Sequence, residues 1–146
     1  MNPAPEILLV DDNPGDVDLV GRALADSVPS HRIHAVNDGE EAIAFLRRVG
    51  KYSDAVRPDL LMLDLNLPRK DGRAVLADVK SDPLLRQIPV VIFSTSRSRR
   101  DIARSYELGA NCYVCKPCGL ADFFAAVQSV EKFWFGHVCL PSMEKP

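Results

Sequence analysis

Short apolar runs recur along the chain, and polar residues follow most of them. The continuous runs cover residues 7–10, 60–63, 89–93 and 112–115. Runs of this length are typical of strands that are buried on both faces of a parallel sheet. Residues 31–36 instead alternate between apolar and polar, which predicts a strand nearer the sheet edge.

Segments with helical periodicity separate the predicted strands. Asn13 followed by Pro14 predicts a helix start, because asparagine caps well and proline suits the first turn. The apolar face of this helix would contain Val17, Val20, Leu24 and Val28. Asp38 and Glu41 resemble a capping box, which predicts a second helix that reaches about Arg48.

Three more helices complete the pattern. One begins at Asp71 and Gly72 and ends at residues 82–83, and a basic helix ends at residues 108–109. The last helix begins near Leu120 and ends at about Gly136. Its apolar stripe would consist of Leu120, Phe123, Phe124, Val127 and Trp134. Five strands alternating with five helices predict a single α/β domain built on a doubly wound parallel sheet.

The end of the last helix carries apolar residues outside that stripe. Phe133 lies about 140° from Leu120 around the helix axis. The other apolar residues in this region are Phe135, Val138 and Leu140. They would leave apolar surface exposed unless the tail folds back over it. We favour a self-association surface formed by Phe133, Trp134 and Phe135.

Composition and charge exclude several classes of protein. The chain has 146 residues, of which 47% are hydrophobic, and its net charge is −2, so there is no electrostatic case for nucleic acid or an anionic membrane. Residues 1–6 lack a basic segment, and the apolar stretch that follows is too short for a signal peptide or a membrane span. We therefore expect a cytoplasmic protein with four reduced cysteines.

Polar residues follow four of the five predicted strands. They are Asp11, Asp12, Asp64, Ser94 and Lys116. Ligands of doubly wound sheets bind at the carboxyl ends of the strands, so these side chains should meet at one sheet edge. Three neighbouring carboxylates must share protons or hold a cation, and a ligand set made only of oxygens favours Mg²⁺.

Asp64 is the candidate for covalent chemistry at this edge. A carboxylate that faces a magnesium ion, the Lys116 ammonium and the Ser94 hydroxyl is equipped to attack phosphorus. The product would be an aspartyl phosphate.

Other functions fit the same residues less well. A hydrolase of the haloacid dehalogenase type also uses an aspartyl phosphate, but it requires a second acid where this chain has Asn66. A binding module without phosphate chemistry would not need the five polar residues. A flavin-binding function is not favoured, because the chain has no phosphate-cradling loop after the first predicted strand.

Two clusters have plainer explanations. Cys112, Cys115 and Cys118 are spaced like metal ligands, but an extended strand points the first two to opposite faces, which favours buried thiols. The arginines at 97, 99, 100 and 104 indicate a solvated helix face or a partner-docking surface. No reader element for nucleic acid accompanies them.

The ordered motifs resemble the receiver domain of two-component response regulators. The motifs are Asp11-Asp12, Asp64, Leu67-Pro68-x-x-Asp71-Gly72, Ser94 and Lys116-Pro117. The resemblance implies a flavodoxin-like (βα)5 fold with strand order 2-1-3-4-5. The receiver domain would cover residues 5–135, and residues 136–146 would form a tail rather than a second domain.

The same resemblance implies a role for each site residue. Asp64 would accept a phosphoryl group from a sensor histidine kinase, in a protein that is otherwise not an enzyme and only catalyses its own phosphotransfer and dephosphorylation. The Mg²⁺ ligands would be Asp11, Asp12, Asp64 and the backbone carbonyl of Asn66. The phosphoryl-binding and switch residues would be Ser94, Thr95, Lys116 and Tyr113. Tyr113 would turn inward on phosphorylation, and the bond before Pro117 would be cis.

A closer resemblance is to the single-domain response regulators of bacterial and cyanobacterial phytochromes. It rests on the Asp-Asn-Pro-x-Asp motif at 12–16, Ser-Thr-Ser at 94–96, residues 104–114, and Phe-Trp at 133–134. It implies a phytochrome kinase as partner and a homodimer formed through the last helix. Two residues depart from the pattern: Ser94 replaces a commoner threonine, and Cys115 stands where threonine is frequent.

Overall fold

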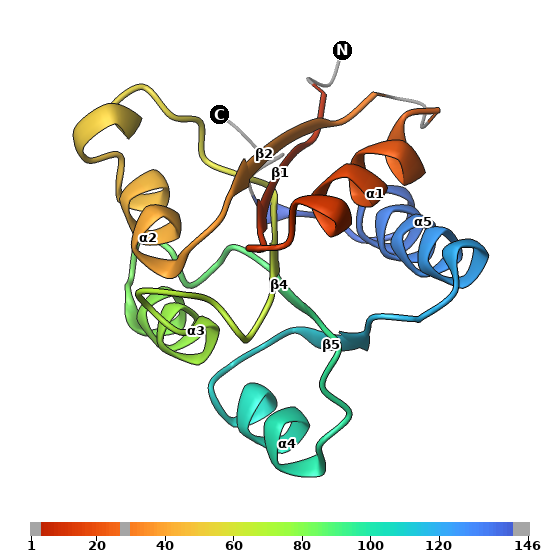
Figure 1. The fold of residues 1–146 in the computed structure, drawn as a ribbon. Helices are drawn as coiled ribbons and strands as arrows, with labels where there is room; N and C mark the ends of the chain where they lie inside the picture. Colours follow the sequence, from red (N-terminus) through yellow and green to blue (C-terminus); the bar gives the residue numbers. More distant parts are fainter. Residues whose placement is uncertain (1–3, 27–29, 142–146) are drawn as a thin grey trace.

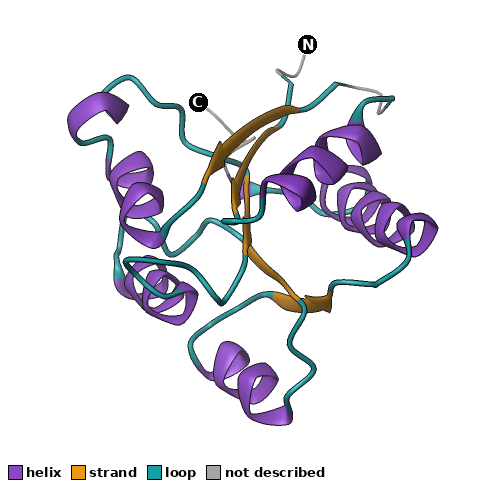
Figure 2. Ribbon diagram, in the orientation of Figure 1, coloured by secondary structure: helices purple, strands orange, loops and turns teal. Residues whose placement is uncertain are grey.

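A parallel sheet forms the centre of the computed structural model, which describes residues 4–26 and 30–141. The strands are β1 (Glu6–Val10), β2 (Arg32–Val36), β3 (Leu60–Leu63), β4 (Val90–Ser94) and β5 (Cys112–Cys115). They form one five-stranded sheet in the order β2-β1-β3-β4-β5 (Figures 1 and 2). The predicted flavodoxin-like order is therefore confirmed, with β2 at one edge and β3 in the middle.

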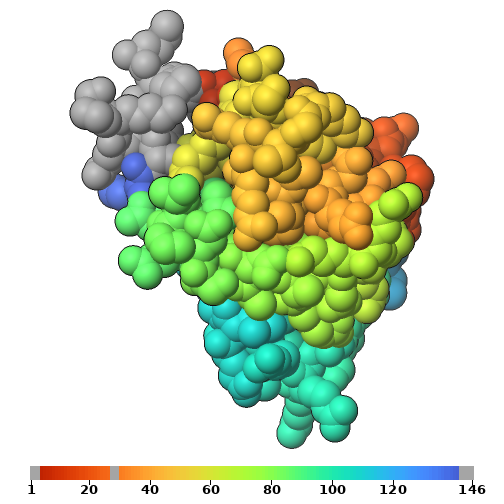
Figure 3. All heavy atoms as spheres, turned by 90° about the vertical axis from the view of Figure 1, so that its left-hand side faces the viewer, coloured from red at the N-terminus to blue at the C-terminus, as the bar shows by residue number. Residues whose placement is uncertain are grey.

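Five α-helices connect the strands. They are α1 (Pro14–Leu24), α2 (Gly39–Arg47), α3 (Gly72–Ser81), α4 (Arg99–Glu107) and α5 (Leu120–Gly136), and a short 3₁₀ helix, η1 (Gly50–Tyr52), follows α2. Helices α1 and α5 cover one face of the sheet, and α2 and α3 cover the other (Figure 1). Seen from this second side, α2 lies above α3, and α4 lies below them (Figure 3). No helix within the described residues is long and apolar enough to cross a membrane.

Alternate residues of the central strands supply two separate cores. Leu61 and Leu63 of β3 pack in the core beneath α2 and α3, whereas Leu60 and Met62 pack in the core beneath α1 and α5. All four are at most 1% exposed. The continuous apolar run of β3 is thus explained by burial on both faces.

The predicted helix starts are confirmed by their caps. The Asn13 side chain accepts hydrogen bonds from the backbone N–H groups of Gly15 and Asp16, and Asp38 accepts one from Glu41. These bonds satisfy N–H groups that have no partner inside a helix. The first helix ends at Leu24, and Val28, predicted for its apolar face, lies outside the described residues.

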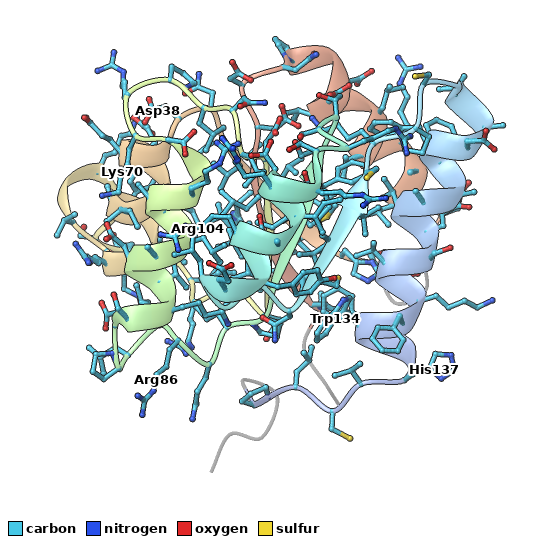
Figure 4. All side chains as sticks on the ribbon, turned by 90° about the horizontal axis from the view of Figure 1, so that it is seen from below. Asp38, Lys70, Arg86, Arg104, Trp134 and His137 are labelled. Atoms are coloured by element: carbon cyan, nitrogen blue, oxygen red, sulfur yellow. The ribbon has the colours of Figure 1, made fainter. Side chains whose placement is uncertain are left out.

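The apolar stripe of α5 differs from the prediction at its start. Phe123, Val127 and Trp134 are buried as expected, but Leu120 is 58% exposed. Helical side chains lean toward the N-terminus, so a residue in the first turn points past the end of the helix. Trp134 points from α5 toward the centre of the molecule, whereas His137 points away from it (Figure 4).

The segment after α5 folds back along the molecule. The N–H groups of His137 and Val138 donate to the Phe133 carbonyl, and Leu140 is only 2% exposed within the core of α1 and α5. The expectation that Leu140 leaves apolar surface exposed is therefore wrong, because the turn after Phe133 directs Leu140 inward, whereas Val138 is half-buried. Phe133 itself remains 54% exposed. Residues 142–146 of the predicted tail lie outside the described residues.

Gly72 lets α3 begin directly against the segment that follows β3. Its N–H donates to the Leu65 carbonyl at 2.9 Å. A Cβ atom at this position would lie 2.1 Å from the carbonyl oxygen of Asp64 and 2.7 Å from the Cα of Leu65. Both neighbours are backbone atoms, so they can move only if β3 or α3 shifts.

We expect Gly72→Ala to lower the free energy of unfolding by about 1–3 kcal/mol, because the methyl group overlaps backbone atoms. Urea unfolding followed by Trp134 fluorescence measures this. The matched control is Gly21→Ala in α1, where nothing lies within 4 Å of the added methyl group. That change should stabilise the helix by about 0.5–1 kcal/mol. Equal stability of Gly72→Ala and wild type would contradict the close approach.

His31, the residue just before β2, packs against the end of α5. Its side chain is 1% exposed, its ring lies 5.0 Å from the Phe135 ring, and Nε2 lies 3.4 Å from a Glu131 carboxylate oxygen. Neither ring nitrogen has a hydrogen-bond partner among the described residues. Burial lowers the pKa of His31 from its ordinary value of 6.5, and Glu131 opposes this shift only in part.

The lowered pKa makes stability depend on pH. As the pH falls, His31 becomes protonated in the unfolded chain before it does in the folded one. The contribution of neutral His31 to the free energy of unfolding is therefore complete above pH 6.5, and it is lost as the pH falls through the pKa of the folded state. When the pH is lowered from about 7 to about 5, we expect the melting temperature of His31→Phe to fall less than that of wild type. His137→Gln, at an exposed position, should behave like wild type. Parallel losses in all three proteins would contradict this.

Candidate functional site

The carboxyl ends of β1, β3 and β5 bring one ammonium group among several carboxylates. Lys116 Nζ lies 2.7 Å from Asp11 Oδ2 and 3.0 Å from Asp64 Oδ2. Lys116, Asp11 and Asp64 are each less than one-tenth exposed. These residues lie 52 to 105 positions apart in the chain, so only the parallel sheet brings them together.

The same edge holds a cluster of three carboxylates. One oxygen each from Asp11, Asp12 and Asp64 lies within 4.8 Å of the others, and Asp12 is exposed to solvent. Among residues 4–26 and 30–141, these three carboxylates are the one group of acidic, histidine or cysteine side chains that lie close enough together to share a metal ion. Oxygen ligands at this spacing suit a hard divalent cation. Asn66 lies at the cluster, since its N–H is 3.4 Å from Asp64 Oδ1.

Asp16 is a fourth carboxylate at the site. Its Oδ2 lies 2.8 Å from Lys116 Nζ, so it binds the ammonium from the first turn of α1. The sequence places Asp16 only in the Asp-Asn-Pro-x-Asp motif at 12–16, without a role at the site. The sequence signal for this contact is that Asp16 lies in the first turn of the helix, shortly after Asp12. A side chain in that turn points back toward the end of β1.

Electrostatics explain why the lysine stays charged. Burial disfavours the charged form of Lys116, but hydrogen bonds to Asp11 and Asp16 and the nearby charges of Asp11 and Asp64 raise its pKa above the ordinary value. Burial also raises the pKa of Asp11, against the hydrogen bonds that it accepts from Lys116 and from the N–H of Asn13. Three carboxylates thus contact one ammonium and Asp12 lies beside them, so the excess negative charge favours a bound cation.

The expected switch residues lie at the end of β4, directly after it, and on β5. Ser94 is fully buried, and its Oγ accepts a hydrogen bond from the N–H of Ser96 at 3.2 Å. Tyr113 is half-buried, and its hydroxyl donates to the Ser96 carbonyl at 2.8 Å. Thr95 is exposed. The cis bond before Pro117 stays a prediction.

The remaining predicted residues lie away from this edge. Phe133, Trp134 and Phe135 belong to the last turns of α5, where Trp134 is buried in the core and Phe135 is half-buried. Cys112 and Cys115 are half-buried free thiols. Burial raises the pKa of Cys112, which keeps its thiol protonated. Cys118 is an exposed free thiol, so the expectation of buried thiols is wrong for Cys118 and holds only in part for Cys112 and Cys115.

An open hollow of about 490 Å³ lies beside the acidic cluster. Its lining includes Asp11 and Asp12 just after β1, Asn37 just after β2, Glu41 of α2 and Tyr52 of η1. The Tyr52 hydroxyl donates to the Glu41 carboxylate, which closes the far wall. Asp12, the exposed member of the cluster, is therefore reachable from solvent on the α1 and α2 side.

Comparison with known proteins agrees with this geometry. The family model of the response regulator receiver domain matches residues 7–128. Response regulator Rcp1 of Synechocystis sp. is 47% identical over 141 residues, which cover 97% of this chain and 96% of Rcp1.

Solved structures are similar over the same range. The phosphorylated cyanobacterial phytochrome response regulator RcpA superposes with a TM-score of 0.93 at 50% identity, covering 95% of this chain and 99% of RcpA. The Mn²⁺-bound form of Rcp1 superposes with a TM-score of 0.90 at 47% identity, covering 94% and 99% of the two chains. Together with the acidic cluster and its lysine, these matches show that the chain belongs to the response regulator receiver domain family.

Proposed function

We propose that this protein is a phosphoacceptor that takes a phosphoryl group from a sensor histidine kinase onto Asp64. The observation that carries the proposal is the contact of the Lys116 ammonium with the Asp64 carboxylate beside a cluster of three acidic groups. A nucleophile, a fixed cation and a place for a metal ion are the parts that phosphoryl transfer needs.

The hydrogen bonds of the cluster favour Asp64 over Asp11 as the acceptor. Asp11 Oδ1 accepts from the N–H of Asn13, and its Oδ2 accepts from Lys116, so both oxygens are engaged. Asp64 Oδ1 has only the long 3.4 Å contact with the N–H of Asn66. Asp64 therefore has the freer oxygen, at the end of the central strand.

Transfer would proceed by attack of an Asp64 oxygen on phosphorus. The bond between phosphorus and the donor nitrogen breaks, and its electron pair returns to the histidine ring of the kinase. Lys116 would hold a phosphoryl oxygen, and the Ser94 hydroxyl would donate to another. Attack of water on the aspartyl phosphate would later restore Asp64, so the protein would act on itself rather than turn over an external substrate.

We infer that Asp11, Asp12, Asp64 and the Asn66 carbonyl hold Mg²⁺. The ion would supply positive charge that offsets the charge on the phosphoryl oxygens. The chemistry of the ligand set supports this choice, because carboxylate and carbonyl oxygens suit magnesium and manganese alike. The similar protein Rcp1 has a Mn²⁺-bound form, which supports a divalent cation site in this chain as well.

A phytochrome histidine kinase is the proposed donor. Support comes from the similarity to RcpA, which is described as a cyanobacterial phytochrome response regulator. The cytoplasmic location and the domain limits at residues 5 and 135 stay predictions.

We expect acetyl phosphate with Mg²⁺ to add one phosphoryl mass to the wild-type protein, as measured by intact-mass spectrometry. Asp64→Asn should add none, because an amide cannot form the acyl phosphate, and EDTA should abolish the reaction in wild type. Asp18→Asn is the matched control, since Asp18 pairs with Arg22 on the exposed face of α1. A phosphorylated Asp64→Asn protein, or an unmodified wild type, would refute the proposal.

We also propose a homodimer formed through the end of α5. Phe133 is 54% exposed, and its ring packs edge-on against Trp134 with centroids 5.5 Å apart. A rigid exposed aromatic ring on a buried one is a suitable anchor for an interface. Because Trp134 is buried within its own chain, the contact would rest on Phe133 and on the half-buried Phe135.

Phe133→Asp should weaken dimerisation on the order of 30-fold, because it places a charge in the contact. Sedimentation velocity across a concentration series measures the change. Leu84→Asp is the control, since Leu84 is 77% exposed in the segment after α3. It should leave the dimer intact. A monomeric wild type, or equal dimer formation in all three proteins, would rule out this interface.

A further inference from the structure

A chain of polar contacts ties the loop after β4 to helix α3. Arg73, the second residue of α3, donates from Nη2 to Asp101 Oδ1 at 2.7 Å. The other oxygen of Asp101, on α4, accepts a hydrogen bond from the Ser96 hydroxyl at 2.6 Å. Arg73, Asp101 and Ser96 therefore form a bridge, which we call the Arg73 bridge, from α3 across α4 to the loop.

Ser96 lies at the centre of the switch residues. Its N–H donates to Ser94 Oγ at 3.2 Å, and its carbonyl accepts from the Tyr113 hydroxyl at 2.8 Å. The Cys115 thiol lies 3.7 Å from the same carbonyl. Moving Ser96 would therefore change the partners of Ser94, Tyr113 and Cys115 together.

The α3 end of the bridge is anchored beside the acceptor. Gly72, the residue before Arg73, packs against the backbone of Asp64 and Leu65. The guanidinium is further held by Asp71, which accepts from Arg73 Nη1 at 3.1 and 3.2 Å. The position of Arg73 therefore follows the backbone that carries Asp64.

The bridge differs from the ordinary surface ion pairs of this protein. The side chains of Arg73 and Asp101 are 31% and 23% exposed, whereas those of Arg22 and Asp18 in α1 are 69% and 60% exposed. The Ser96 hydroxyl and the Arg73 guanidinium hold the pKa of Asp101 below its usual value, so the carboxylate remains charged. Partly buried pairs that share a hydrogen-bond network contribute more than isolated exposed pairs.

We propose that Arg73 is a positioning residue for the phosphoryl switch, which acts through Asp101 to hold the Ser96 carbonyl where the Tyr113 hydroxyl reaches it. The inference rests on the proposed function and adds a residue outside the acidic site. With the bridge formed, the loop is already ordered when the phosphoryl group arrives. Without it, part of the binding free energy is spent on ordering the loop, which lowers the apparent affinity.

The test measures the affinity of the wild-type protein for beryllofluoride with Mg²⁺, a non-covalent mimic of the phosphoryl group, by tryptophan and tyrosine fluorescence. We expect Arg73→Gln and Asp101→Asn each to weaken binding about fivefold, which is the lower end of typical coupling between sites. The double variant should lose no more than either single one, because both remove the same bridge. Arg73→Lys should recover part of the affinity. Arg104→Gln, which removes an exposed pair with Glu107, should bind like wild type.

A double-mutant cycle with Tyr113→Phe separates positioning from a general loss of structure. Phenylalanine cannot donate to the Ser96 carbonyl, so the effect of Arg73→Gln should shrink in that background. Full additivity of the two changes would overturn the inference, as would equal affinities of Arg73→Gln and Arg104→Gln in a wild type that binds the mimic. A wild type that binds no beryllofluoride would overturn the proposed function, and this inference with it.

Discussion

The burial of Lys116 among carboxylates is the constraint on which the rest of the site depends. An ammonium group that is only 5% exposed would be strongly destabilising alone, and so would the carboxylates of Asp11 and Asp64. Together they neutralise part of each other's charge, with Asp16 as a further partner. The remaining negative charge leaves the edge ready for a divalent cation. Stability and chemistry therefore use the same side chains.

The scaffold makes this balance possible because it holds the charged groups on rigid backbone. Strand β3 is buried on both faces by two cores, so Asp64 at its end has little freedom to move. Gly72 brings the start of α3 into contact with the Asp64 backbone, and Arg73 follows directly. The proposed acceptor Asp64 and the proposed Arg73 bridge thus share one structural support, through which the bridge would couple Asp64 to the loop after β4.

The class of fold and most of the acidic edge could be predicted from local patterns, whereas the strand order 2-1-3-4-5 came from the resemblance to receiver domains. Apolar runs identified the strands, and the polar residues after them included Asp11, Asp64 and Lys116. Parallel strands place their carboxyl ends at one edge, so position in the chain was enough to predict that they meet. The Ser96 contacts with Asp101 and Tyr113 could not be predicted, because short polar side chains in loops choose partners only after the backbone has been placed.

The sequence by itself therefore determined the succession of strands and helices along the chain, the helix caps and the chemical groups at the sheet edge. Periodicity and capping act over a few residues, so they can be read without coordinates. Only the tertiary structure decided that Asp16 joins Lys116, that Leu140 is buried, and that Trp134 belongs to the core while Phe133 stays exposed. Each of these depends on where a helix end or a tail lies against the rest of the molecule, which is set by packing between segments that are distant in the chain.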